Sequence, residues 1–485
     1  MRRRAKSNSV RLQWDGQDQV AAAAGEAVAG WHCLETTLDS GPQEDGPTPT
    51  GPNALLHADN LAALHDLSKR GWNGRFALGY IDPPFAMGRD LHWQRKVGGE
   101  DLQGPAYSDR WDGGLAAYLS ATVPRLEAML PLLADDGVLV VHADWRAAAA
   151  LRVALDERLG PACFRNEVIW RRAPNLGRQA ASHQLGRIHD TLLIYCKSPT
   201  GRFRGELPRL SEPWPLSKSA TPLGARRDPT SGRWYRLAPR GDYTDASLER
   251  LEAEGRLHQT GSGAKYIRYF LPTDAKGRWV RDRPLDSIWD DAAVCPLRHV
   301  SPKERLGYDT QKPEGLLQRI IDWTTQAGDW VLDPCCGSGT TAAVAERSSR
   351  RWLTIDVGTM AIHTARRRLL DRMSLPALVI WRDSACPLPE TWPLQWQWVQ
   401  HNDGLQLDLR QCGATLDGWS LQPLADTTDG QAPHQHQHSA FAGTTGRVLP
   451  LLVAWPAGWR KARLLVLDVY GRVAQAVVEP SAGAI

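Results

Sequence analysis

The chain has 485 residues, of which 42% are hydrophobic and 23% charged, with a formal net charge of +4. It is longer than one ordinary domain and lacks the long uncharged apolar run that a membrane span needs. Eight scattered cysteines without C-x-x-C spacing argue against a disulfide framework or a zinc site. Together with a basic N-terminus that has no signal-peptide pattern, they predict a cytoplasmic protein.

The N-terminal segment, residues 1–52, is rich in Ala, Gly, Asp and Gln and ends in several Pro and Gly residues. This composition predicts a largely flexible leader and a domain boundary near residue 52. A short apolar strand follows within residues 53–60. Asp59 or Asn60 can then cap a helix over 61–69 whose leucines share one face.

Residues 77–85 are the most informative stretch of the chain. An apolar strand stops at Asp82-Pro83-Pro84-Phe85, because two consecutive prolines offer no backbone N–H to a sheet ladder. Open α/β sheets place ligands at this end of their strands. The Asp82 carboxylate, the Pro83 carbonyl and the Phe85 ring suit a flat ring that bears an exocyclic amine. Taken alone, the four residues are equally consistent with an ordinary Pro-Pro turn.

After Phe85, a polar stretch up to about residue 112 shows no clear pattern and is compatible with a loop over the site. From there to residue 196, helices and strands alternate. The predicted elements are a helix over 115–133 that Pro124 and Pro131 kink or shorten, a strand over 138–142, a helix over 145–159, and strands over 166–170 and 190–196. The last two strands could pair as an antiparallel edge. The alternation predicts an α/β fold with a mostly parallel sheet covered on both faces.

The alternation stops over residues 197–300, which are rich in Pro, Gly, Arg and Trp. One short helix over 246–254 and one strand over 265–270 are expected there, within an insertion on the core. Residues 171–240 hold 14 Lys or Arg against 4 Asp or Glu, the excess that a phosphate-tracking surface needs. A solvated arginine-rich segment is the alternative interpretation.

A second strand–turn–helix unit follows a helix predicted over 311–326. Its strand, residues 329–333, leads through Pro-Cys-Cys-Gly-Ser-Gly to a helix that starts at Thr340. The glycines let the backbone approach a ligand, and the helix N-terminus offers N–H groups to a carboxylate. Asp356 ends the next strand and can hold ribose hydroxyls. These features indicate a site for an adenosine-bearing ligand, although a tight turn beside a solvated Asp would give the same pattern.

The pattern changes again beyond residue 373. Residues 464–470 and 473–478, separated by a Gly-Arg turn, predict a β-hairpin, and alternating tryptophans near residue 397 predict another strand. A small β-rich appendage is therefore expected. Three alternating histidines, His434, His436 and His438, fit a solvated low-complexity loop better than a metal site.

In combination, these motifs resemble those of the DNA amino-methyltransferases, which transfer a methyl group from S-adenosylmethionine to adenine N6 or cytosine N4. The resemblance covers about residues 53–372 and follows the order of the permuted β group, with the catalytic tetrapeptide before the cofactor loop. It rests on Asp82-Pro83-Pro84-Phe85 as the catalytic motif, Gln311-Lys312-Pro313 on the preceding helix, residues 333–341 as the cofactor loop, Asp356 as the ribose-binding acid and Asp59 as an acid near the cofactor.

The resemblance implies a doubly wound, Rossmann-like α/β core with a mostly parallel sheet and an antiparallel edge. It divides the chain into a leader (1–52), a catalytic half (53–197), a target-recognition insertion (198–300), a cofactor-binding half (301–372) and a β-rich C-terminal appendage of unknown role (373–485). The implied cofactor-binding residues are Asp59, Lys312, Asp333, Cys335, Gly337, Gly339, Thr340 and Asp356. The family usually has a bulky residue where Cys335 stands, so cofactor affinity is expected to be weaker unless a neighbour fills the gap. No metal is expected.

The implied reaction is direct methylation of an adenine flipped out of double-stranded DNA, with Asp82 and the Pro83 carbonyl orienting the amine. Asp82 favours adenine, because cytosine-N4 enzymes more often carry Ser there. Cytosine-N4 methylation and a catalytically silent DNA-binding subunit are the alternatives. An NAD-dependent oxidoreductase is disfavoured because Ala342 stands at the third glycine position of the dinucleotide pattern. A restriction endonuclease partner and a homodimer are further options, and no membrane partner is expected.

Overall fold

The computed structural model describes residues 11–17, 27–36, 45–97, 100–173, 185–239, 241–261, 263–296, 302–372, 377–386, 396–401, 404–409, 416–423, 438–441, 452–454, 461–468 and 473–479. The chain divides into two units, Met1–Glu206 with Ser287–Ile485, and Leu207–Asp286. The second unit lies within the segment that was predicted to be an insertion.

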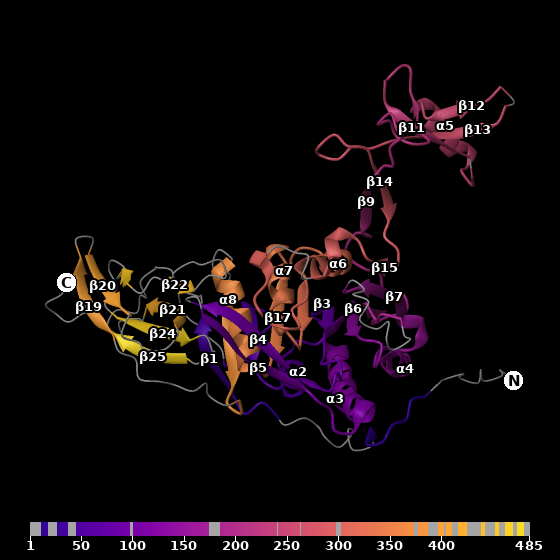
Figure 1. Cartoon of the computed structure of the whole chain (residues 1–485). Coiled ribbons are helices and arrows are strands. Elements are labelled where there is room, and N and C mark those ends of the chain that lie inside the picture. The colour runs from indigo at the N-terminus through magenta and orange to yellow at the C-terminus, as the bar shows by residue number, and fades with distance from the viewer. Residues whose placement is uncertain are drawn as a thin grey trace, which may run out of the picture. The chain divides into compact units, whose positions relative to one another are not determined.

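A ten-stranded mixed sheet forms the centre of the larger unit (Figure 1). Its strands lie in the order β1 (Trp31–Thr36), β18 (Leu378–Asp383), β2 (Asn53–His57), β17 (Arg351–Asp356), β16 (Trp330–Asp333), β3 (Phe76–Ile81), β6 (Leu133–Ala143), β8 (His189–Cys196), β7 (Phe164–Arg171) and β15 (Ile288–Trp289). Pairing is parallel from β18 through β6, whereas β8 runs antiparallel to both β6 and β7. The predicted mostly parallel sheet with an antiparallel edge is confirmed.

Helices cover both faces of this sheet, which explains why every residue of β3 is buried. On one face, α2 (Asn60–Lys69), α3 (Gly114–Met129) and α4 (Ala148–Leu159) pack in succession, and on the other α6 (Glu314–Thr324), α7 (Thr340–Arg347) and α8 (Thr359–Arg372) do so. Helix α6 begins three residues later than predicted, because Pro313 is its N-cap. Helix α3 accommodates Pro124 and passes into the short 3-10 turn η1 (Leu130–Leu132).

The leader prediction was wrong for residues 31–36, which form the edge strand β1, antiparallel to β18. The Trp31 indole N–H donates to Asp66 at 2.8 Å, and Glu35 is ion-paired with Arg366 of α8. These contacts join residues that are distant in sequence, so local composition did not reveal them. The sheet also extends beyond residue 372, because β18 follows α8.

The stretch after Phe85 that showed no pattern forms an antiparallel hairpin of β4 (Arg89–Val97) and β5 (Glu100–Asp109). The hairpin is bonded to the segment before α6, since Gln94 N–H donates to the Gly307 carbonyl at 2.7 Å. Its last residues therefore reach the carboxyl edge of the sheet, next to the turn at Asp82.

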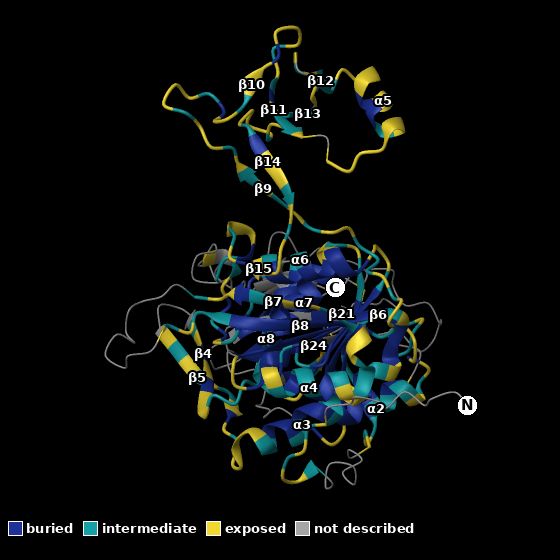
Figure 2. Cartoon of the chain, turned by 90° about the vertical axis from the view of Figure 1, so that its right-hand side faces the viewer, coloured by how far each residue is buried: buried dark blue, intermediate teal, exposed yellow. Residues whose placement is uncertain are grey.

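The smaller unit contains a four-stranded antiparallel sheet in the order β10 (Arg226–Arg227), β11 (Trp234–Pro239), β13 (Lys265–Phe270) and β12 (Leu257–Gln259). Helix α5 (Asp245–Ala253) follows β11, and a separate two-stranded ladder joins β9 (Arg209–Pro213) to β14 (Val280–Pro284). The helix and the strand predicted at 246–254 and 265–270 are confirmed. Figure 2 shows much of this unit exposed, in contrast to the buried strands of the large sheet.

The C-terminal residues that the structure describes form β-structure, as predicted. One sheet has the order β19 (Gln397–His401), β20 (Gly404–Asp408) and β23 (Leu452–Ala454), and another β22 (His438–Phe441), β21 (Leu416–Pro423), β24 (Ala462–Asp468) and β25 (Val473–Val478). Buried Asp417 of β21 pairs with Arg95 of the hairpin and, at 2.7 Å, with His363 of α8, so the appendage is bonded to the core.

Two further observations concern features that the sequence analysis considered. His434 and His436 lie outside the described residues, whereas His438 begins β22. Among the helices of the described residues, none has the length and apolar character needed to cross a lipid bilayer.

Candidate active site

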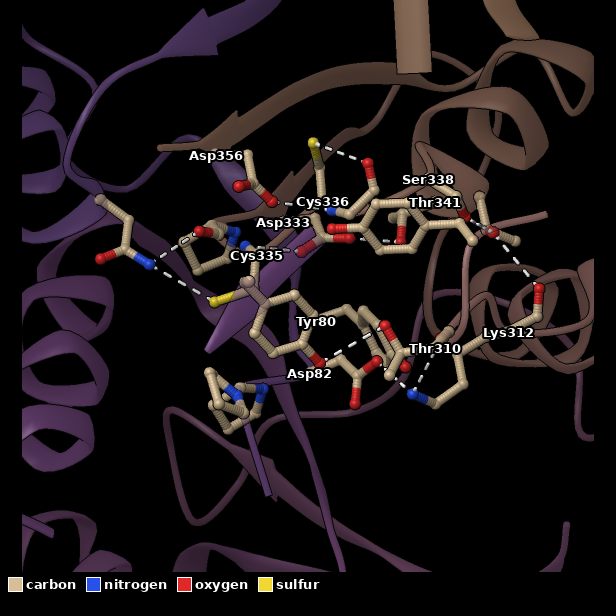
Figure 3. A pocket seen from close by; sticks show the side chains of 18 of the residues that line it. Tyr80, Asp82, Thr310, Lys312, Asp333, Cys335, Cys336, Ser338, Thr341 and Asp356 are labelled. Carbon is tan, nitrogen blue, oxygen red and sulfur yellow. Dashed lines mark hydrogen bonds and ion pairs between the residues drawn. The ribbon is translucent and has the colours of Figure 1, made fainter. Parts of the chain in front are cut away.

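A cavity of about 290 Å³ lies at the carboxyl ends of the central strands β3, β16 and β17 (Figure 3). The structure brings ten of the twelve predicted site residues to its wall: Asp82, Pro83, Pro84, Phe85, Lys312, Asp333, Cys335, Gly337, Thr340 and Asp356. The two strand–turn motifs, about 250 residues apart in sequence, thus face one pocket because β3 and β16 are parallel neighbours.

The carboxylate of Asp82 is held asymmetrically. Its Oδ2 is ion-paired with the Lys312 ammonium group, and the two side chains are 15% and 11% exposed. Its Oδ1 is buried and has no hydrogen-bond partner within the part of the chain that the structure describes. The Lys312 ammonium also lies 5.0 Å from the centre of the Phe85 ring. Lys312, which was predicted on the cofactor side, therefore contacts the Asp-Pro-Pro-Phe side of the pocket.

Asp109, at the end of β5, fixes the turn that follows Phe85. Its Oδ2 accepts the backbone N–H groups of Phe85 at 3.1 Å and Met87 at 2.9 Å. Its Oδ1 accepts the N–H of Ala86 and the indole N–H of Trp111, both at 2.9 Å. Asp109 is fully buried, and the bonds hold Ala86 in a left-handed conformation with φ of 54°. One carboxylate thus sets the direction in which the Phe85 side chain leaves the turn.

A buried polar network lies behind Asp82. His142, at the end of β6, is fully buried, with Nε2 3.2 Å from Asp190 and Nδ1 3.0 Å from the Tyr80 hydroxyl. The same Nδ1 lies 4.0 Å from Asp82 Oδ1. Burial would raise the pKa of Asp190, but the hydrogen bond from His142 and nearby cations, Arg172 among them, lower it. Burial holds the pKa of Tyr80 well above its usual value, so this group remains a hydroxyl donor.

The loop after β16 is organised by two acids. Asp333 accepts the Thr341 hydroxyl at 2.5 Å and the Cys335 N–H at 3.0 Å, and burial raises the pKa of Asp333 to about 7. Asp356 accepts the backbone N–H of Gly337 at 2.9 Å, and burial raises the pKa of this carboxyl also. These bonds shape the turn, and both carboxylates still line the cavity.

Gly339 and Thr340 connect the loop to α7. Gly339 has φ of 72°, and a Cβ there would lie 2.7 Å from the Ala365 Cβ, so it packs directly against α8. The fully buried Arg368 side chain of α8 donates to the Thr340 hydroxyl at 2.7 Å and to Glu314 of α6 at 2.6 Å. Helices α6, α7 and α8 are thereby bonded together beneath the loop.

Two predicted site residues do not line the cavity. Gly339 lies in the turn behind it, and Asp59 caps α2 by accepting the Ala62 N–H at 3.0 Å and pairs with Arg125 at 3.1 Å. The neighbouring Asn60 lines the cavity instead, donating to the Pro334 carbonyl at 2.9 Å and to the Cys335 sulfur at 3.4 Å.

Sequence analysis did not single out several residues of the site. Aromatic side chains from three segments line the cavity: Tyr80, Tyr107, Trp111 and Tyr308. Asp109, His142 and Asp190 act behind its wall. A weak signal existed for His142 and Asp190, which stand at the end of one predicted strand and the start of another. Antiparallel pairing of those strands brings the two residues to one edge, but the sequence left the pairing open.

Comparison with known proteins agrees with this geometry. A family model described as DNA methylase matches residues 76–367, which is more than half of the chain. The chain therefore belongs to this DNA methylase family, and the resemblance inferred from its motifs is confirmed.

Curated relatives extend this result. The chain is 28% identical over 334 residues to the type II methyltransferase M.EcaI of Enterobacter cloacae, covering 65% of this chain and 69% of that protein. It is 24% identical to the probable type III restriction-modification enzyme HindVI Mod subunit of Haemophilus influenzae, with 65% of this chain matched to 50% of that subunit. The chain thus spans only half the length of the Mod subunit. Among solved structures, the cytosine-N4-specific PvuII DNA methyltransferase matches 67% of this chain and 88% of its own, with 17% identity and a TM-score of 0.34.

Proposed function

We propose that this protein transfers a methyl group from S-adenosylmethionine to the N6 amine of an adenine flipped out of double-stranded DNA. The observation that supports this most directly is the Asp82 carboxylate, with Oδ2 paired to Lys312 and Oδ1 buried without a partner among the described residues. A buried, unpaired acceptor is unfavourable until a donor enters the pocket. An exocyclic amine supplies such a donor.

The other side of the cavity fits S-adenosylmethionine. A ligand ammonium group would favour the charged form of buried Asp333, whose pKa of about 7 leaves it near the midpoint of its titration at neutral pH. Asp356 retains lone pairs for ribose hydroxyls beside its two backbone hydrogen bonds. Gly337 has φ of 48°, and a Cβ there would come no closer than 3.5 Å to Tyr308, so the backbone is open to the cavity. When bound, the cofactor supplies an electrophilic methyl group on a sulfonium.

The residues around Asp82 would orient the base. Asp82 Oδ1 and the Pro83 carbonyl accept the two amine protons, which turns the nitrogen lone pair out of conjugation with the ring. Phe85 stacks on the base, and such stacking stabilises it by about 1–3 kcal/mol. This offsets part of the few kcal/mol that unpairing and unstacking cost. Lys312 keeps Asp82 oriented as an acceptor. Most of the catalysis then comes from holding the amine in line with the methyl group.

Three further assignments belong to the proposal: the DNA-recognition region, the partner and the target base. The unit 207–286 contains fifteen Lys or Arg against ten Asp or Glu, which suits a target-recognition region in contact with DNA phosphates. The names of the relatives, a type II methyltransferase and a Mod subunit, support a restriction endonuclease as a partner in the same system. Asp rather than Ser at position 82 supports adenine over cytosine.

Methyl transfer by variants at Asp82 tests the proposal. Asp82→Ala should abolish transfer of labelled methyl groups to duplex DNA, because the amine loses its acceptor, while DNA binding in a gel-shift assay is retained. Asp90→Ala is the matched control, since Asp90 is an exposed hairpin carboxylate paired with Arg110 at 3.0 Å. Transfer by the Asp82→Ala protein at the wild-type rate would overturn the assignment.

A further inference from the structure

The described part of the large unit contains two buried histidine–aspartate pairs, and one of them lies against the catalytic motif. His142 and Asp190 are fully or almost fully buried, and their side chains are 3.2 Å apart. Since an ionised carboxylate can only accept, His142 Nε2 carries the proton of this bond. Nδ1 is then the basic nitrogen, and the Tyr80 hydroxyl donates to it at 3.0 Å.

The basic nitrogen faces the catalytic carboxylate. His142 Nδ1 lies 4.0 Å from Asp82 Oδ1, the oxygen that has no hydrogen-bond partner in the described structure. The imidazole ring also lies 5.5 Å from the Phe85 ring, between centroids. The histidine therefore contacts the amine-holding group without lining the cavity itself.

Other polar groups around the pair set its charge balance. Tyr80 and Asp82 face it from β3 and the following turn, and Lys312 approaches Asp82 from the segment before α6. The Trp170 ring of β7 lies perpendicular to the imidazole, with the two ring centroids 5.6 Å apart. Arg172, 42% exposed, pairs with the second oxygen of Asp190 at 2.7 Å. The pair thus extends from Asp82 to a solvent-exposed cation.

We infer that His142, oriented by Asp190, receives the proton that the target amine releases on methylation. This inference rests on the proposed function. The amine lone pair forms the new N–C bond while the sulfonium C–S bond breaks, and the electron pair of that bond stays on sulfur. The nitrogen then holds one proton too many. Asp82 Oδ1 takes this proton and passes it to His142 Nδ1, whereupon the Tyr80 hydroxyl turns from donor to acceptor.

The pair would return Asp82 to its ionised form after each transfer. Without it, a protonated Asp82 would donate rather than accept and would lose its attraction to Lys312. Asp190 stabilises the imidazolium that forms, in the way that a carboxylate orients and supports a histidine base in other enzymes. His142 and Asp190 are positioning residues in this scheme, because they act through Asp82.

The test is the pH dependence of single-turnover methylation, measured from about pH 5.5 to about pH 8.5. The wild-type rate should fall toward low pH, because an imidazole that already carries a proton on both nitrogens cannot accept the one that the amine releases. His142→Asn should lower the rate by about 100-fold, at the lower end of the range for proton-transfer groups, and should remove that acid limb. Asp190→Asn should lower the rate less and displace the limb. Cofactor and DNA affinities should stay within about twofold of wild type, since neither residue lines the cavity.

His363→Asn is the matched control. His363 is 4% exposed and pairs with Asp417 at 2.7 Å, so this variant breaks an equivalent buried pair away from the cavity. It should melt at a lower temperature than wild type but keep the acid limb. The inference is overturned if His142→Asn retains the limb, or if its rate falls only together with cofactor affinity. A wild-type protein that transfers no methyl group would instead contradict the proposed function.

Discussion

Replacing Asp109 by Asn tests whether one buried carboxylate positions the catalytic turn. Asp109 accepts four N–H groups, two on each oxygen, at 2.9–3.1 Å. Asparagine has an NH2 group in place of one carboxylate oxygen. The two N–H groups that this oxygen accepted would then face a donor instead of an acceptor. Leaving a buried donor unsatisfied costs about 1–3 kcal/mol, which gives about 2–6 kcal/mol for the pair.

The hydrogen bonds that are lost hold the turn that carries Phe85, so the substitution destabilises this turn. Part of this destabilisation should be relieved by local rearrangement, so we expect the free energy of unfolding in urea to fall by about 2–3 kcal/mol. The rate of methyl transfer should fall by at least about 10-fold, because a small displacement of the stacking ring misaligns the base. Cofactor affinity, measured by calorimetry, should change by less than about threefold, since Asp109 forms no bond to the 333–341 loop.

Asp90→Asn on the same hairpin serves as the control. Asp90 is exposed and bonds to Ser108 and Arg110 at the surface, so stability and transfer rate should both be unchanged. A folded Asp109→Asn protein that transfers methyl groups at the wild-type rate would show that Asp109 does not position the turn, as would a loss of cofactor binding equal to the loss of rate.

Three further predictions concern the cavity. Lys312→Met should reduce the transfer rate and lower the free energy of unfolding by up to about 3 kcal/mol, because it leaves the Asp82 carboxylate without its cation; urea unfolding with unchanged stability would contradict this. Gly339→Ala should destabilise the protein more than Gly71→Ala in thermal melting. Both glycines have positive φ, of 72° and 85°, but only Gly339 is packed against α8, and equal effects would exclude the steric argument. For the cofactor-free protein, the raised pKa of Asp333, about 7 against 3.8, means that the native state holds a proton that the unfolded chain releases. The free energy of unfolding should therefore fall as pH rises from about 4 to about 7 and level off above, and Asp333→Asn should lack this slope.

The two strand-end motifs could be predicted from sequence because each is local. Two prolines after an apolar strand, or a Gly-x-Gly turn between strand and helix, restrict the backbone wherever they occur. The pairing of β3 with β16, which the structure adds, then places both motifs at one edge of the sheet.

What sequence analysis missed depends on pairing between distant segments. The edge strand β1 pairs with β18 across more than 300 residues, and the β4–β5 hairpin is irregular and polar, so neither has a strong local pattern. Asp109 is informative only once its carboxylate is seen on the turn after Phe85. For Asp59, the local capping pattern is what the structure shows, and the neighbouring Asn60 rather than Asp59 lines the pocket.

Transfer of the labelled methyl group of S-adenosylmethionine to unmodified duplex DNA, followed by digestion and separation of the nucleosides, identifies the base that the protein methylates. We expect label in N6-methyladenine, at a defined sequence, and none when Asp82 is replaced by Ala. Label confined to N4-methylcytosine would contradict the assignment of the base. Absence of label from any DNA, in a folded protein that also fails to bind the cofactor, would contradict the proposed function itself.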